Sequence, residues 1–212
     1  MPSGTVITFS LNTLSAIVAL LTSYYAYRSN RLVGNSVLTA ISIGFMLLGI
    51  GLAADAGTSL LTGKLLVQVP ADRLLTVLAS FSYLTVQMVA YLVIAVGYGR
   101  AAYGSTAKVA APTVFAGWAA SLYGFSVLSY FVVLVLLAFV VFQGFLLRAG
   151  KNHGMSAIVL LAFGLVLVAH LLLLVSALTL GTGLFLLGTG VQFLGFLALL
   201  VFVVRSEVVV PK

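Results

Sequence analysis

The sequence predicts an all-α integral membrane protein, a helical bundle with seven transmembrane helices. Three observations support this fold class: the composition, a series of long apolar runs, and the distribution of basic residues. Of the 212 residues, 63% are hydrophobic and only 6% are charged. A globule of this length could not surround so many apolar side chains with polar surface. Lipid is therefore the expected solvent, and the lipid bilayer is the first expected partner.

Runs of about 20 apolar residues have the length that an α-helix needs to cross roughly 30 Å of hydrocarbon. The first run is long enough to span, and the residues before it lack the basic segment of a cleavable targeting signal, so it is expected to be a signal anchor. The runs predict helices at residues 5–27, 35–56, 74–98, 125–147, 155–178 and 182–204.

The segment 109–124 is shorter and only moderately apolar, so it predicts either a seventh crossing or an interfacial helix beside six spans. If it crosses, eight of the ten Lys and Arg share one side, and only Lys64 and Arg73 lie on the other. If it does not cross, the basic residues divide into four and six. Cytoplasmic loops carry an excess of basic residues. This rule favours seven spans in the cell membrane, with the N-terminus outside and the C-terminus in the cytoplasm.

Two patterns recur along the chain and indicate an internal repeat. Gln87 is followed by Arg100 after thirteen residues, and Gln192 is followed by Arg205 at the same spacing. A second pattern recurs at a separation of 120 residues: Arg28, Arg31, Gly34, Ser36 and Gly44 match Arg148, Lys151, Gly154, Ser156 and Gly164.

Two three-helix units can share one membrane orientation only if an additional helix joins them. The repeat therefore predicts a 3+1+3 arrangement of two parallel repeats. We expect a first three-helix repeat over residues 1–100, a linker with a short helix over 101–124, and a second three-helix repeat over 125–212.

Few residues in the chain could carry out catalysis or bind a cofactor. It has no cysteine, and its carboxylates and imidazoles are limited to Asp55, Asp72, Glu207, His153 and His170. These are too few to make catalysis by paired carboxylates or a metal site a good expectation. We therefore expect no enzyme activity, no cofactor and no metal. The basic residues lie at the ends of apolar runs, which is a membrane-orientation pattern rather than a nucleic-acid-binding face.

Polar residues inside the predicted spans are the candidate functional residues. Buried amides must be hydrogen-bonded, so Gln87 and Gln192 are expected either to bond to each other or to face a wet pocket. His170 is interpreted as a neutral imidazole bonded to a neighbouring helix, or as a ligand or proton site. The predicted polar pocket opens toward the outer half of the membrane, although helix ends also tolerate polar side chains. Its residues are Asn12, Gln87, Tyr91, His170 and Gln192.

The predicted 3+1+3 plan resembles that of the SWEET-type sugar transporters, in which two three-helix bundles flank a linker helix. That resemblance implies transport of a small solute. The SWEET-type proteins use prolines within helices as hinges, whereas the prolines of this chain lie outside its main predicted spans, at Pro2, Pro70, Pro112 and Pro211.

These observations favour a non-catalytic polytopic membrane protein, either an accessory subunit of a membrane complex or a sensor module. Its expected partners are other membrane-protein subunits or further copies of itself. The alternative is a small-solute transporter or channel built from two three-helix bundles. A water-accessible cavity that reaches Gln87 and Gln192 would favour transport, and a dry centre would favour a partner-binding module.

Overall fold

The computed structural model describes residues 3–65, 71–103, 122–149 and 156–208, with side chains placed for 6–58, 81–102, 127–149 and 156–205. This part of the chain is all-helical, and each helix is long and apolar enough to cross a membrane. The expected membrane helical bundle is confirmed at this level. The helices are α1 (Ser3–Val33), α2 (Ser36–Leu65), α3 (Ala71–Tyr103), α4 (Leu122–Ala149), α5 (Ala157–Thr179) and α6 (Thr182–Val208).

A two-residue connection joins α1 to α2. Gly34 has φ +67°, a left-handed conformation that glycine adopts without a steric cost, and its N–H donates to the Asn30 carbonyl at 2.7 Å. The Asn35 side-chain oxygen accepts from the Val37 N–H at 2.8 Å and caps the start of α2. The chain therefore reverses its direction immediately, and α1 and α2 form an antiparallel hairpin.

A second two-residue connection joins α5 to α6. Leu180 takes the left-handed conformation with φ 55°. The Ser176 hydroxyl donates to the Gly181 carbonyl at 2.8 Å, and the Gly181 N–H donates to the Ser176 carbonyl at 3.3 Å. At the other end of α5, the Ser156 side chain accepts from the Ile158 N–H at 3.3 Å and caps the helix.

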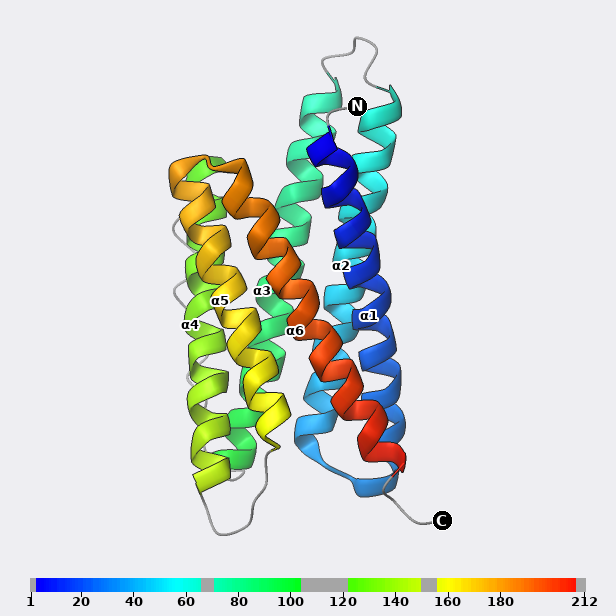
Figure 1. Ribbon diagram of the computed structural model, residues 1–212, viewed down its shortest axis with the longest axis vertical. Helices are drawn as coiled ribbons and strands as arrows, with labels where there is room; N and C mark the ends of the chain where they lie inside the picture. Colours follow the sequence, from blue (N-terminus) through cyan, green and yellow to red (C-terminus); the bar gives the residue numbers. More distant parts are fainter. Residues whose placement is uncertain (1–2, 66–70, 104–121, 150–155, 209–212) are drawn as a thin grey trace.

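The six helices form a closed ring in which each contacts the one before it and the one after it, and α6 returns to contact α1. The starts of α1, α3, α4 and α6 lie at the same end of the bundle as the ends of α2 and α5 (Figure 1). We call this the N-terminal end, and the opposite one the C-terminal end. Although α3 and α4 follow each other in sequence, they therefore run in the same direction.

The predicted seventh span lies almost entirely outside the described residues. Only its last three residues, Leu122 to Gly124, are described, and they begin α4. The helix α4 thus begins three residues before the predicted helix over 125–147, and α3 ends at Tyr103, five residues after its predicted end at residue 98. The described structure contains six helices of spanning length, where the sequence predicted seven spans for the whole chain.

Basic side chains gather at the C-terminal end. Every Lys or Arg with a described side chain lies near the C-terminus of α1, α3, α4 or α6: Arg28, Arg31, Arg100, Arg148 and Arg205. Arg28 and Arg31 belong to α1, which continues six residues beyond its predicted end at residue 27.

Small residues allow the helices to approach closely. A Cβ atom added to Gly97 of α3 would overlap the Cβ of Ala40 on α2, and one added to Gly195 of α6 would lie 2.6 Å from Val166 Cγ2 on α5. Because lipid gives apolar helices no hydrophobic drive to associate, such contacts supply much of the packing energy. Reciprocal bonds of 2.7 and 3.1 Å between the hydroxyls of Ser23 and Ser42 and each other's carbonyls also hold α1 to α2.

Gly97→Ala is expected to lower the melting temperature of the purified protein, because the new methyl group would force α2 and α3 apart. Overpacking of this kind costs about 1–3 kcal/mol. The matched control is Gly164→Ala in α5, where an added Cβ has nothing within 4 Å and alanine favours the helix. An equal loss of stability in both variants would contradict this account of the packing.

Single cysteines should report the shared direction of α3 and α4, since the chain contains no cysteine of its own. Val33→Cys and Ala157→Cys should react with a membrane-impermeant maleimide from one side, and Leu180→Cys from the other. All three positions are exposed. Reaction of positions 33 and 157 from opposite sides would contradict this arrangement.

Candidate functional site

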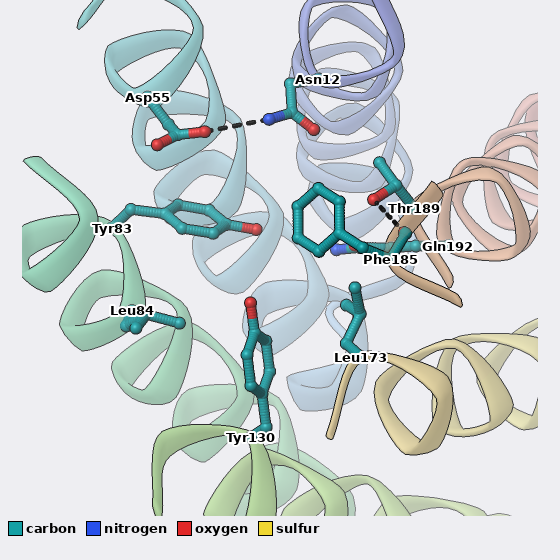
Figure 2. A pocket seen from close by; sticks show the side chains of 9 residues that line it. All are labelled: Asn12, Asp55, Tyr83, Leu84, Tyr130, Leu173, Phe185, Thr189 and Gln192. Carbon is teal, nitrogen blue, oxygen red and sulfur yellow. Dashed lines mark hydrogen bonds between the residues drawn. The ribbon is translucent and has the colours of Figure 1, made fainter. Parts of the chain in front are cut away.

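A cavity of about 210 Å³ lies within the bundle toward its N-terminal end (Figure 2). Every one of the six helices contributes at least one side chain to its wall. The residues that line it are Asn12, Asp55, Tyr83, Leu84, Tyr130, Leu173, Phe185, Thr189 and Gln192.

The wall near the N-terminal end holds a hydrogen-bonded pair from α1 and α2. Asn12 Nδ2 donates to Asp55 Oδ2 at 2.9 Å, and Asn12 is buried while Asp55 is half-buried. Asp55 lies three residues before Thr58, where the apolar span of α2 ends, or about 5 Å along the helix. A carboxyl group at this depth is costly unless it is paired or hydrated, and such residues usually mark functional sites.

Two tyrosine hydroxyls point into the cavity, one from α3 and one from α4. Figure 2 shows Tyr83 of α3 and Tyr130 of α4 with their hydroxyl groups directed toward the space between them. Gln192 of α6 lies deeper, ten residues after Thr182, or about 15 Å along the helix. Its Nε2 atom is buried and donates no hydrogen bond to any described residue.

Next to the cavity, a buried hydrogen bond links α3 to α5. His170 Nδ1 lies 2.8 Å from the Val166 carbonyl, which can only accept, so Nδ1 carries the proton of this bond. Gln87 Nε2 lies 2.8 Å from His170 Nε2. The amide nitrogen can only donate, so His170 Nε2 accepts and the imidazole is neutral in this arrangement. Both side chains are almost fully buried.

Tyr91 completes this buried polar cluster. Its ring meets the His170 ring edge-on, with centroids 5.2 Å apart. Its hydroxyl lies beside the amides of Gln87 and Gln192, but no hydrogen bond of good geometry joins them. The Tyr91 hydroxyl, Gln87 Oε1 and Gln192 Nε2 are all buried without a partner among the described residues. Native proteins normally satisfy such groups with protein or with ordered water.

Toward the C-terminal end, the centre of the bundle is filled by aromatic rings. Phe45 and Phe196 pack edge-to-face with centroids 5.2 Å apart, and Tyr98 and Phe163 do so at 5.5 Å. All four side chains are buried. Buried polar side chains also occur toward this end: Gln143 of α4 is fully buried, and Ser23 and Ser42 join α1 to α2.

The five candidate residues fall into two neighbouring groups. Asn12 and Gln192 line the cavity, whereas Gln87, Tyr91 and His170 form the buried cluster. Of the two alternatives for the glutamines, the mutual bond is absent, because Gln87 bonds to His170 instead, and of the two only Gln192 lines the cavity. The expected bond between the imidazole and a neighbouring helix is present. Ligand binding by these residues stays a prediction.

Sequence reasoning missed several lining residues. Tyr130 is a polar aromatic in an otherwise apolar run, which is a weak signal that could have been used. Thr189 lies between two glycines, a context typical of close helix packing, and its hydroxyl donates to the Phe185 carbonyl of its own helix at 2.9 Å. Phe185 has no signal, since nothing local distinguishes an aromatic residue that faces a cavity from one that faces lipid.

No protein family, curated protein or solved structure matches this chain. Its chemistry therefore follows from the residues in place. Among the described residues, no three His, Asp or Glu side chains are grouped as a metal site requires. The cavity wall offers hydrogen-bonding groups, one carboxyl group and three aromatic rings, an arrangement suited to binding a small solute.

Gln87→Leu and His170→Leu should each lower the melting temperature, because each leaves the other polar group buried without its partner. The double variant should lose less stability than the sum of the two single losses. A coupling free energy of about 0.5–1.5 kcal/mol is expected from a double-mutant cycle in detergent. Strict additivity would show that the bond contributes nothing to stability.

Proposed function

We propose that this protein is a non-catalytic membrane module that binds a small polar solute in the cavity near its N-terminal end. It acts as a membrane sensor or as the solute-binding accessory subunit of a larger complex. The observation that carries the proposal is a polar cavity lined by all six helices. A solute bound there contacts every helix, so its binding energy can bias the arrangement of the whole bundle.

The distribution of polar and apolar groups along the bundle favours a sensor over an open channel. The cavity reaches Gln192, but the buried pairs Phe45–Phe196 and Tyr98–Phe163 occupy the centre beyond it. Exposed apolar side chains such as Tyr24, Phe131, Phe142 and Phe145 leave ample surface for lipid, for partner subunits or for a second copy of the chain.

A small-solute transporter is the second candidate. The helices α1–α3 and α4–α6 follow one another around the ring in the same order and with the same directions, as expected for two parallel repeats. Transporters of this construction bind their substrate near the bilayer midplane, between the repeats. In this proposal the aromatic pairs form a gate that opens in a second conformation.

The predicted 3+1+3 topology belongs to the same proposal. The helix α3 ends at the C-terminal end of the bundle and α4 starts at the N-terminal end, and 18 residues separate Tyr103 from Leu122 in the sequence. As a helix they would extend about 27 Å, close to the hydrocarbon thickness. The arginines near the C-terminal end of the bundle support a topology in which this end faces the cytoplasm and the N-terminus of the chain lies outside the cell membrane.

The binding function is tested by melting the purified protein with choline, glycine, urea or acetate. At least one of these solutes should raise the melting temperature of the wild type, and Gln192→Leu should abolish the rise. Leu194→Ala, a change on the exposed face of the same helix, is the matched control and should keep it. If none of the four solutes raises the melting temperature of the wild type, the solute-binding proposal fails.

Flux measurements distinguish the two candidates. The stabilising solute, radiolabelled, should not accumulate in proteoliposomes if the protein is a sensor or an accessory subunit. Saturable uptake that is lost in Gln192→Leu and kept in Leu194→Ala would instead establish the transporter.

A further inference from the structure

The lining of the cavity contains one acidic residue and no basic residue. Asp55 is its one ionisable group apart from the two tyrosines, and none of the nine lining residues is basic. Among the described residues, the hydrogen bond from Asn12 occupies one carboxylate oxygen, Oδ2. Asn12 is neutral, so it orients the carboxylate without cancelling its charge. A cation in this space would interact with Asp55 in surroundings of low polarity, where Coulomb attraction is strong.

Aromatic rings form much of the remaining wall. Tyr83, Tyr130 and Phe185 come from α3, α4 and α6, and Figure 2 shows them around one space with Asp55 on its rim. The faces of aromatic rings attract cations, and cages of such rings recognise ammonium groups in other proteins. Asp55 is the only carboxylate in this wall, and no three His, Asp or Glu side chains are grouped among the described residues. The wall therefore suits an organic cation better than a metal ion.

Gln192, at the deep end of the cavity, favours a ligand that also carries a hydrogen-bond acceptor. Gln192 Nε2 is a buried donor that makes no hydrogen bond of good geometry, although the hydroxyls of Tyr83 and Tyr91 lie beside the amide, and the residue is only 3% exposed. A ligand that fills the cavity can satisfy it with a hydroxyl, ether or carbonyl oxygen. The volume of about 210 Å³ corresponds to about seven water molecules in the liquid, so the cavity accommodates a small compound.

We propose that the cavity is selective for small organic monocations, namely ammonium compounds that also carry a hydrogen-bond acceptor. Asp55 supplies the opposite charge, the rings of Tyr83, Tyr130 and Phe185 surround the ammonium group, and Gln192 donates to the acceptor at the other end. This inference rests on the proposed solute-binding function and narrows it to one chemical class.

Isothermal titration calorimetry on the full chain in nanodiscs tests this selectivity. The probes are choline, ethanolamine, acetate and the uncharged isostere of choline in which a tert-butyl group replaces the trimethylammonium group. Choline or ethanolamine should bind at least about tenfold more tightly than the isostere, and acetate should bind more weakly still.

Variants of Asp55 and Tyr130 separate the charge from the aromatic faces. Asp55→Asn keeps the size and the hydrogen-bonding capacity and should reduce the preference for the cation over the isostere to about threefold or less, whereas Asp55→Glu keeps the charge and should retain it. Tyr130→Leu should weaken cation binding more than isostere binding, and Tyr130→Phe should preserve the preference. If Asp55→Asn fails to fold, the comparison of Tyr130→Leu with Tyr130→Phe still tests whether the cavity prefers the cation.

The outcomes distinguish cation selectivity from the solute-binding function on which it rests. Equal affinities for choline and its isostere, tighter binding of acetate, or an unchanged preference in both Asp55→Asn and Tyr130→Leu would overturn cation selectivity while leaving a solute-binding protein. Binding of none of these probes, nor of the solutes named for the proposed function, would overturn both.

Discussion

The need to satisfy every polar group inside a hydrocarbon environment is the constraint on which this bundle depends. Water is scarce there, so a buried amide, carboxyl or imidazole has to find its partner on another helix or in a hydrated cavity. Asn12 meets Asp55, Gln87 meets His170, and the hydroxyls of Ser23 and Ser42 bond across α1 and α2. These bonds help determine which faces of α1, α2, α3 and α5 point inward, a choice that apolar contacts leave open because lipid and protein are equally apolar.

The tightest glycine contact and the cavity lie in different halves of the molecule. The tightest glycine contact, Gly97 against Ala40, lies toward the C-terminal end, in the same half as the edge-to-face pair Tyr98–Phe163. Larger polar side chains from α3, α4 and α6 meet toward the N-terminal end, and there the cavity remains. The solute site we propose is thus located between Tyr83, Tyr130 and Gln192. It lies on the N-terminal side of the aromatic pairs that fill the centre of the bundle.

The sequence predicted the helices well because hydrophobicity along a run of 20 residues is a local property. It underestimated their length at the ends, as at Arg28 and Arg31, because helices continue beyond the hydrocarbon with polar residues. Side-chain pairing is not local: Gln87 and His170 are 83 residues apart, and the repeat pattern suggested Gln192 as the partner instead. Residues such as Phe185 and Tyr130 become cavity residues only through the angles at which whole helices pack.

The two-residue connections at Gly34-Asn35 and Leu180-Gly181 have a consequence for biogenesis. Helices joined so tightly can enter the bilayer from the translocon as hairpins, α1 with α2 and α5 with α6. The Asn12–Asp55 bond lies within the first hairpin, so the carboxyl group of Asp55 can acquire its partner during insertion, before the rest of the chain is synthesised. The bond between Gln87 and His170 joins helices from different parts of the chain, so it forms only after α5 has been inserted. Because α1 and α2 are synthesised first, the carboxyl group of Asp55, which is costly to bury in hydrocarbon, can be paired before the amide of Gln87 and the imidazole of His170.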